Sequence, residues 1–167
     1  MLLGLGKIIH CPGGKIPFSV AMDFSDLDFV SCRTSAAPVV AQGTVVNTAG
    51  VLQLDAQVTA EICGICDRCA QEFSRQIQIP VNAVLETDPD SAQSDDLWNF
   101  PVTGDSVDLE EIVRTAFVFG IDSKMLCRPD CKGLCCRCGA DLNHEACTCK
   151  AEVDPRFAIL QKLLDKQ

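Results

Sequence analysis

Residues 39–62 read VVAQGTVVNTAGVLQLDAQVTAEI. Two apolar-rich stretches, Val39–Val46 and Val51–Ile62, flank the turn-forming residues Asn47-Thr48-Ala49-Gly50, a pattern typical of an antiparallel β-hairpin. In the second stretch apolar and polar side chains alternate, so each kind occupies one face of the strand. The apolar face comprises Leu52, Leu54, Ala56, Val58 and Ala60. The sequence therefore predicts a half-buried hairpin in the middle of the chain.

The same alternation predicts a third long strand over Phe73–Glu86. Pro80 within it indicates an edge strand or a bulge, because proline cannot donate a ladder hydrogen bond. Thr87–Asp96 is rich in Asp, Ser and Pro, which predicts an exposed mobile loop. Shorter strands are expected at Leu2–Ile9, Ile16–Met22 and Leu97–Val102.

Two helices are expected. The acidic stretch Asp105–Glu111 suits the positive end of a helix dipole, and the helix itself is predicted over about 108–120. Near the C-terminus, Asp154 can cap a helix whose first residue is Pro155. The inner stripe of the first helix is expected at Leu109, Ile112, Val113, Ala116 and Phe117.

These elements predict an α+β fold on an antiparallel sheet, with a barrel-like closure of that sheet as one expectation. We divide the chain into a mainly antiparallel β domain with a central helix (1–121), a Cys-rich zinc-binding segment (122–150) and a C-terminal helix (151–167). A chain of 167 residues with 47% hydrophobic content is long enough to build a core.

The second segment is dense in cysteine. It holds six candidate ligands, with Cys136 as a seventh thiol beside them: Cys127, Cys131, Cys135, Cys138, Cys147 and Cys149. Thiolates bind Zn²⁺ tetrahedrally, and the Cys-x-x-Cys spacing of Cys135 and Cys138 suits one tight turn. Gly139 fits that turn because glycine accepts a positive φ. Zinc is the expected cofactor; an iron–sulfur cluster and metal-free thiols are the alternatives.

The identity of the second ligand pair stays open. Cys147 and Cys149 are slightly favoured, because the chain between them and Cys138 is about the length of a short hairpin; Cys127 and Cys131 are the alternative pair, and two metals sharing a thiolate are also conceivable. Four thiolates saturate zinc and leave no place for water or substrate, so a structural site is expected.

A second constellation, Cys63, Cys66 and Cys69, lies between two predicted strands. It offers three thiolates and needs a fourth ligand such as Cys32 or Cys11, or an approach to the C-terminal cysteines. A redox pair would require a helix N-terminus after a strand to lower the thiol pKa, so a connecting turn is favoured. Both histidines are expected to be ordinary side chains, with His144 exposed in a loop.

The N-terminal residues and the lengths of the apolar runs bear on the expected cellular location. Met1–His10 lacks the features of a signal peptide, and no apolar run approaches the roughly 18 residues of a membrane span. A reducing, cytoplasmic location without membrane contact is therefore expected, which disfavours a disulfide framework.

Charge limits the possible partners. The net charge of −9 argues against broad nucleic-acid binding. However, residues 122–150 hold five basic and four acidic side chains, against nine and nineteen elsewhere, so any nucleic-acid contact is expected there. No phosphate loop, nucleophile elbow or paired carboxylates are recognisable, and an enzyme is not expected.

Four separated motifs resemble the YceD family, described as large ribosomal RNA subunit accumulation proteins. They are Cys66-Asp67-Arg68-Cys69, Val107–Glu111, Cys131–Asn143 and Asp154–Phe157. The resemblance spans about residues 39–164 and departs from the family at Cys136, where proline is commoner. It implies a non-enzymatic factor in ribosome biogenesis that supports accumulation or processing of the large-subunit (23S) ribosomal RNA.

The partner implied is that RNA or a ribosomal protein. For RNA, the expected phosphate contacts are the basic residues near the cysteines: Arg68, Arg75, Lys124, Arg128, Lys132 and Arg137. The alternative is a zinc-stabilised protein-interaction module whose acidic surface binds a basic ribosomal protein.

Overall fold

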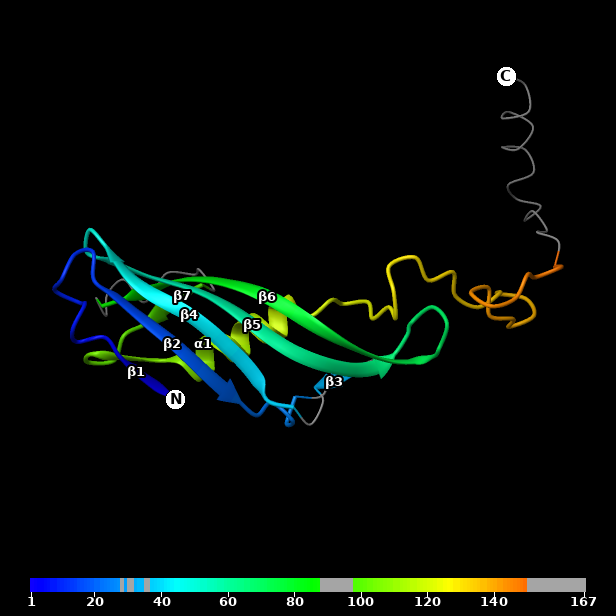
Figure 1. Ribbon diagram of the computed structural model, residues 1–167, viewed down its shortest axis with the longest axis horizontal. Coiled ribbons are helices and arrows are strands. Elements are labelled where there is room, and N and C mark those ends of the chain that lie inside the picture. The colour runs from blue at the N-terminus through cyan, green and yellow to red at the C-terminus, as the bar shows by residue number, and fades with distance from the viewer. Residues whose placement is uncertain (28, 30–31, 35–36, 88–97, 150–167) are drawn as a thin grey trace, which may run out of the picture.

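The computed structural model describes residues 1–27, 29, 32–34, 37–87 and 98–149. Figure 1 shows an elongated, strand-rich molecule with a single helix in this part of the chain. The strands are β1 (Leu2–Gly4), β2 (Lys15–Met22), β3 (Cys32–Thr34), β4 (Val39–Thr48), β5 (Val51–Ile65), β6 (Glu72–Glu86), β7 (Asn99–Pro101) and β8 (Ser106–Asp108), and the helix is α1 (Leu109–Gly120).

The hairpin expected from residues 39–62 forms the centre of the sheet. β4 and β5 pair antiparallel from Thr48↔Val51 to Val40↔Thr59. The apolar face of β5 is buried or half-buried while its polar face points largely to solvent, as the alternation predicts. β5 also pairs with β6, from Leu52↔Leu85 to Ile65↔Glu72. These two strands, of 15 residues each, are the longest of the described elements.

The sheet has the order β2-β4-β5-β6-β7, and β3 pairs with β5 beyond the end of β4. β7 rejoins the sheet as expected, but parallel to β6 and only opposite Val84–Glu86. Pro80 lies outside the part of β6 that pairs with β7. Among the described strands it is paired only with β5, opposite Gln57. The edge position that proline indicated is confirmed.

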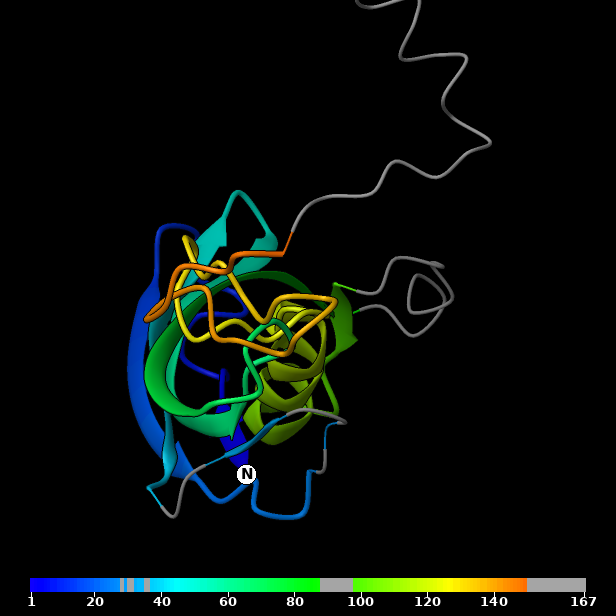
Figure 2. The same ribbon diagram turned by 90° about the vertical axis from the view of Figure 1, so that its right-hand side faces the viewer.

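The barrel-like closure is wrong. Among the described strands β2 and β7 stand at opposite edges of one open sheet, and the remaining pair, β1 and β8, makes a separate two-stranded ladder. Figure 2 shows the sheet curling around α1. α1 lies on the concave side of the sheet, where its apolar stripe shares one core with the strands, so that core forms without pairing of the two edges.

The helix agrees with the sequence prediction. Asp108 is its N-cap and accepts a hydrogen bond of 3.0 Å from the Glu110 amide. The side chains of the expected stripe, from Leu109 to Phe117, are all buried. The Phe117 ring packs edge-to-face on Phe24 at 5.6 Å, which links the helix to the connection that follows β2.

Residues Leu2–Ile9 do not form one strand. The strand ends at Gly4, and the Ile8 amide then donates to the Leu5 carbonyl in a turn. The buried Asn47 side chain explains this, since its Nδ2 donates to the Ile8 and Ile9 carbonyls at 2.7 and 2.9 Å and holds the turned chain against the hairpin. The predicted mobile loop after Thr87 and the predicted C-terminal helix lie outside the described residues, except for Thr87 itself.

A close approach of two backbones occurs at Gly43, which pairs with Ala56. A β-carbon at position 43 would meet the Asp55 carbonyl oxygen and lie 2.5 Å from the Ala56 Cβ. Glycine in a strand interior commonly marks such an approach. The close packing of β4 and β5 here therefore requires the absence of a side chain.

We expect Gly43→Ala to destabilise the fold by about 1–3 kcal/mol through overpacking. Chemical denaturation of the reduced protein measures this decrease in stability. Gly4→Ala is the matched control, because a β-carbon at this strand glycine meets nothing within 4 Å. Equal stability of the two variants would contradict the close packing at Gly43.

Candidate metal centres

Eight cysteines form two groups, each able to direct four sulfurs at one point. In each group the four Sγ atoms lie within 4.8 Å of one another. The proximal cluster, next to the sheet, is Cys66, Cys69, Cys127 and Cys131; the distal cluster is Cys135, Cys138, Cys147 and Cys149. All twelve cysteines of the chain are free thiols.

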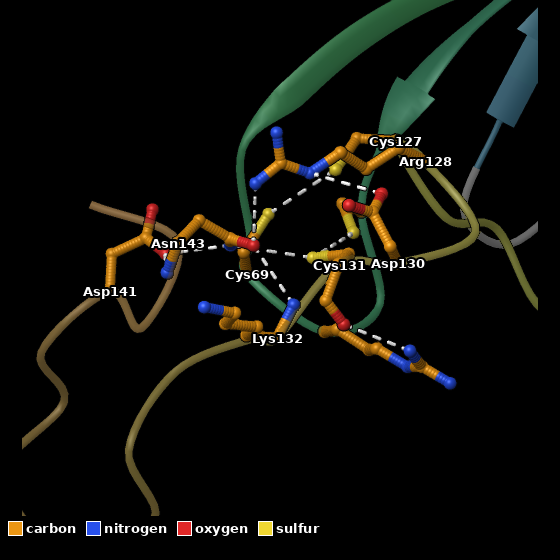
Figure 3. Close-up of polar contacts among 10 residues, drawn as sticks. Cys69, Cys127, Arg128, Asp130, Cys131, Lys132, Asp141 and Asn143 are labelled. Carbon is orange, nitrogen blue, oxygen red and sulfur yellow. Dashed lines mark hydrogen bonds and ion pairs between the residues drawn. The ribbon is translucent and has the colours of Figure 1, made fainter. Parts of the chain in front are cut away.

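The proximal cluster joins two distant parts of the chain. Cys66 and Cys69 occupy the turn between β5 and β6, and Cys127 and Cys131 follow α1. The sulfurs face each other in pairs, Cys66 with Cys131 at 3.9 Å and Cys69 with Cys127 at 3.8 Å. Figure 3 shows Cys69, Cys127 and Cys131 converging from these two segments.

Hydrogen bonds hold the two segments in register. The Asp67 amide donates to the Met125 carbonyl at 2.8 Å, and the Met125 amide donates back to Asp67 Oδ2 at 2.6 Å. On the other side, Arg68 Nη1 donates to the Cys131 carbonyl at 2.9 Å, and the Leu134 amide donates to the Arg68 carbonyl at 3.0 Å. These four bonds fix the knuckle of the β5–β6 turn against the chain that follows α1.

A glycine permits this contact. Gly133 has φ of 76°, and a β-carbon there would lie 2.9 Å from the Arg68 carbonyl oxygen. Only glycine combines the left-handed backbone with the missing side chain at this point. The Lys132-Gly133-Leu134 stretch is therefore shaped to lie on the β5–β6 turn.

Electrostatics in the proximal cluster favour partial ionisation. Burial opposes ionisation of Cys66, but the amides of Cys127, Cys69 and Arg68 outweigh it and lower its pKa to about 6. Burial and the neighbouring thiols raise the pKa of Cys127 to about 12. One sulfur is thus ready to bind a cation, while another holds its proton until a cation displaces it.

The distal cluster is a local structure within the Cys-rich segment. The Cys135 amide donates to the Ala140 carbonyl at 2.8 Å, and Gly139 closes the turn with φ of 73°, as its position predicted. Cys147 Sγ lies 3.3 Å from Cys135 Sγ and 3.5 Å from Cys138 Sγ. Cys138 and Cys149 are exposed, in contrast to the ligands of the proximal cluster.

The distal cluster also contains one thiol with a lowered pKa and one with a raised pKa. The amides of Cys138 and Arg137 lower the pKa of Cys135 to about 6. The neighbouring thiols of Cys147 and Cys138 raise the pKa of Cys149 to about 12. An ion binding here would likewise displace protons.

Both clusters fit a tetrahedral thiolate-binding metal. A Zn–S bond of about 2.3 Å places tetrahedral sulfurs about 3.8 Å apart, close to the separations in the proximal cluster and slightly above those in the distal one. Backbone amides also point at sulfur, as with Cys149 N to Cys147 Sγ at 3.2 Å. The donor set is soft and anionic, which suits zinc or iron and excludes a calcium or magnesium site.

The structure brings Cys135 and Cys138 together with the favoured partners, Cys147 and Cys149. Cys127 and Cys131 instead meet Cys66 and Cys69, so the approach of the turn cysteines to the C-terminal ones is the alternative that the structure realises. Cys11, Cys32, Cys63 and Cys136 belong to neither group. His144 is exposed and its Nε2 lies 3.7 Å from Asp141 Oδ2.

Sequence reasoning placed Asn143 in a family motif but assigned it no contact with the cysteines. Its Nδ2 donates to Cys131 Sγ at 3.5 Å, and its Oδ1 accepts from the Lys132 amide and from Arg128 Nη2, each at 2.9 Å (Figure 3). Asp141 Oδ1 in turn accepts from the Asn143 side chain at 2.7 Å. Such second-sphere contacts orient metal ligands. Asn143 thereby links the chain between the distal ligand pairs to the proximal cluster.

The basic residues near the clusters differ in their surroundings. Arg68, Lys124, Arg128, Lys132 and Arg137 are exposed. Arg75 is half-buried, pairs with Asp122 at 2.8 Å and lies over the Phe73 ring, so its guanidinium is already engaged. Arg128 also lies 3.5 Å from Asp130.

A strand-rich α+β fold with two tetrathiolate clusters defines this chain as a cysteine-rich protein with two candidate metal centres. Among the described residues, no helix combines the length and the apolar character needed to cross a bilayer. A family model described as "Large ribosomal RNA subunit accumulation protein YceD" matches residues 54–164, which include all eight clustered cysteines. The chain belongs to the YceD family.

Several curated proteins are similar to it. A Zea mays protein named large ribosomal RNA subunit accumulation protein YCED homolog 1, chloroplastic, is 29% identical over 89% of this chain and 60% of its own length. The protein of that name from Arabidopsis thaliana is 25% identical over 98% of this chain and 60% of its own length. An uncharacterized protein of Mycobacterium tuberculosis is 32% identical over 64% of this chain and 53% of its own length.

The chain thus spans little more than half the length of these relatives. No solved structure matches it.

We expect metal affinity to fall with acidification, and to fall more steeply below pH 6. Above that pH the Cys66 and Cys135 thiols are already ionised, whereas below it they too hold protons that a metal must displace. Competition with a chromophoric chelator at several pH values measures the slope. A pH-independent affinity would contradict thiolate ligation.

Proposed function

We propose that this protein is a non-enzymatic factor that supports accumulation or processing of large-subunit ribosomal RNA, and that it binds this RNA through the basic residues around its cysteine clusters. Membership of the YceD family is the observation that carries the proposal, together with the names of the plant relatives. The factor would act in the cytoplasm, where thiols stay reduced.

Zinc in the distal cluster is part of this proposal. Four thiolates would hold the ion in a closed coordination sphere, so it would stabilise the segment and would not activate water. Structural zinc contributes roughly 10–16 kcal/mol of apparent binding free energy in small cysteine-rich units. The described segment after Met125 buries few apolar side chains, so an ion is the natural source of its order.

Charge distribution supports RNA contact at this end of the molecule. Figure 1 shows the Cys-rich segment at the end of the molecule where the β5–β6 turn lies. Lys132 and Arg137 are exposed on the loops that lead into and through the distal knuckle. A phosphate backbone is recognised by such cations, and each bound phosphate adds to the salt dependence of binding.

Charge reversal tests the RNA contact. We expect Lys132→Glu with Arg137→Glu to weaken binding to a large-subunit RNA transcript and to reduce the log–log salt slope by about 1 for each phosphate that is no longer bound. Filter binding at several salt concentrations, on protein of unchanged metal content, gives both quantities. Lys7→Glu with Lys15→Glu is the matched control, because both lysines are exposed in the N-terminal region. Unchanged affinity in the first variant would contradict the proposal.

A protein partner is the second candidate. The net charge of −9 favours it, as does the engagement of Arg75 by Asp122 and of Arg128 by Asn143. An acidic surface attracts a basic ribosomal protein and orients the encounter.

On this alternative, a basic ribosomal protein would copurify with the tagged chain after exhaustive nuclease treatment and would dissociate as salt is raised. Mass spectrometry of the eluate identifies it. Disappearance of the copurifying protein on nuclease treatment alone would show that RNA bridges the two and would remove the alternative.

A further inference from the structure

The proximal cluster connects the sheet to the rest of the Cys-rich segment. Its two facing pairs of sulfurs join residues 65 and 58 positions apart in the sequence. The chain between its two arms contains β6, β7, β8 and α1. A bond across this cluster would therefore close a long loop, and the entropic cost of closing a loop grows only slowly with its length.

No disulfide joins the facing sulfurs. The facing pairs lie 3.9 and 3.8 Å apart, whereas a disulfide bond needs about 2.05 Å. The separations instead match the edges of a tetrahedron around one ion. All four sulfurs lie within 4.8 Å, so one point is accessible to every ligand.

A purely apolar role for these thiols does not explain their surroundings. Cys66, Cys69 and Cys131 are 2%, 5% and 2% exposed and pack against Phe73 and Leu126, as core residues would. Yet the Asn143 side-chain amide donates to Cys131 Sγ at 3.5 Å. Donors directed at sulfur stabilise a thiolate, and a buried thiolate needs a cation.

The same segments carry compensating charge. A dication with four thiolates keeps a net negative charge, and burial makes that charge costly. The two ligand loops and the residue after them hold Arg68, Arg128 and Lys132 against Asp67 and Asp130, a balance of one positive charge. The exposed positions of the three basic side chains let them offset the charge without being buried themselves.

We propose that the proximal cluster binds one zinc ion as a second metal centre, separate from the distal one, and that this ion fastens the Cys-rich segment to the β5–β6 turn. The four hydrogen bonds of Asp67 and Arg68 then set the orientation in which the segment is held. The inference does not rest on RNA binding, since it concerns metal content alone.

Metal content of the full chain, purified under reducing conditions, tests the proposal. We expect two zinc ions per chain, one in Cys66→Ser with Cys69→Ser, and one in Cys135→Ser with Cys138→Ser. Cys63→Ser and Cys136→Ser are matched controls that should keep both ions, because neither thiol belongs to a cluster. Iron in place of zinc, or a metal count that is the same in the wild type and in the Cys66 and Cys69 variant, would overturn it; a single wild-type ion that this variant loses would instead contradict zinc in the distal cluster.

A second measurement covers the case in which that variant does not fold. In the wild type, alkylation mapped by mass spectrometry should find Cys66, Cys69, Cys127 and Cys131 protected until a strong chelator is added, while Cys11 and Cys136, both exposed, react throughout. The distal cysteines should lose protection at lower chelator concentration, because two of them are exposed. Protection of the proximal thiols that persists after complete removal of metal would overturn the proposal.

Discussion

The attachment of the chain after α1 to the β5–β6 turn is the interaction on which the Cys-rich segment depends. The sheet and α1 share one apolar core, with side chains such as Phe117 and Leu54 fully buried. That core ends at Met125. Among the described residues, the buried apolar cluster beyond it consists of the three cysteines Cys66, Cys69 and Cys131. Sulfur and hydrogen-bond contacts therefore replace hydrophobic burial as the source of order at this end.

How far the sequence predicts this structure depends on the range of each interaction. The strands β4, β5 and β6 and the buried stripe of α1 follow from local alternation and helical spacing, so residues such as Leu52 and Ile112 could be assigned to the core in advance. Sheet closure is not local. It depends on where α1 packs, and no periodicity in the strands encodes that position. The same holds for β3, whose pairing with β5 depends on how β4 ends.

The cysteines show the same contrast. The distal ligands lie within 15 consecutive residues, so spacing alone brings Cys135 and Cys138 near the favoured partners. The two pairs of proximal ligands are separated in the sequence by β6, β7, β8 and α1. Their spacing therefore allowed contact between the turn cysteines and the C-terminal cysteines only as one alternative among several. The available signal was that Cys63, Cys66 and Cys69 supply only three thiolates, so a metal site there needs a ligand from elsewhere in the chain. Which of them turns inward is decided by strand register, since Cys63 pairs with Ser74 inside the ladder and is withdrawn from the turn.

Charge around the clusters has two uses that compete for the same side chains. Arg68 and Arg128 donate to the Cys131 carbonyl and to Asn143, and on the proposed metal site they would also offset thiolate charge, which leaves them less able to contact phosphate. Lys132 and Arg137 are exposed and belong to the Cys-rich segment, which Figure 1 shows at one end of the molecule. Residues 122–150 hold five basic and four acidic side chains and are close to neutral, whereas the rest of the chain holds nine and nineteen. Such an asymmetry orients a polyanion during encounter, because the acidic body repels it more strongly than the near-neutral end does. The proposed RNA contact would then form at this end of the acidic chain, where the attachment to the β5–β6 turn holds the segment in a fixed position.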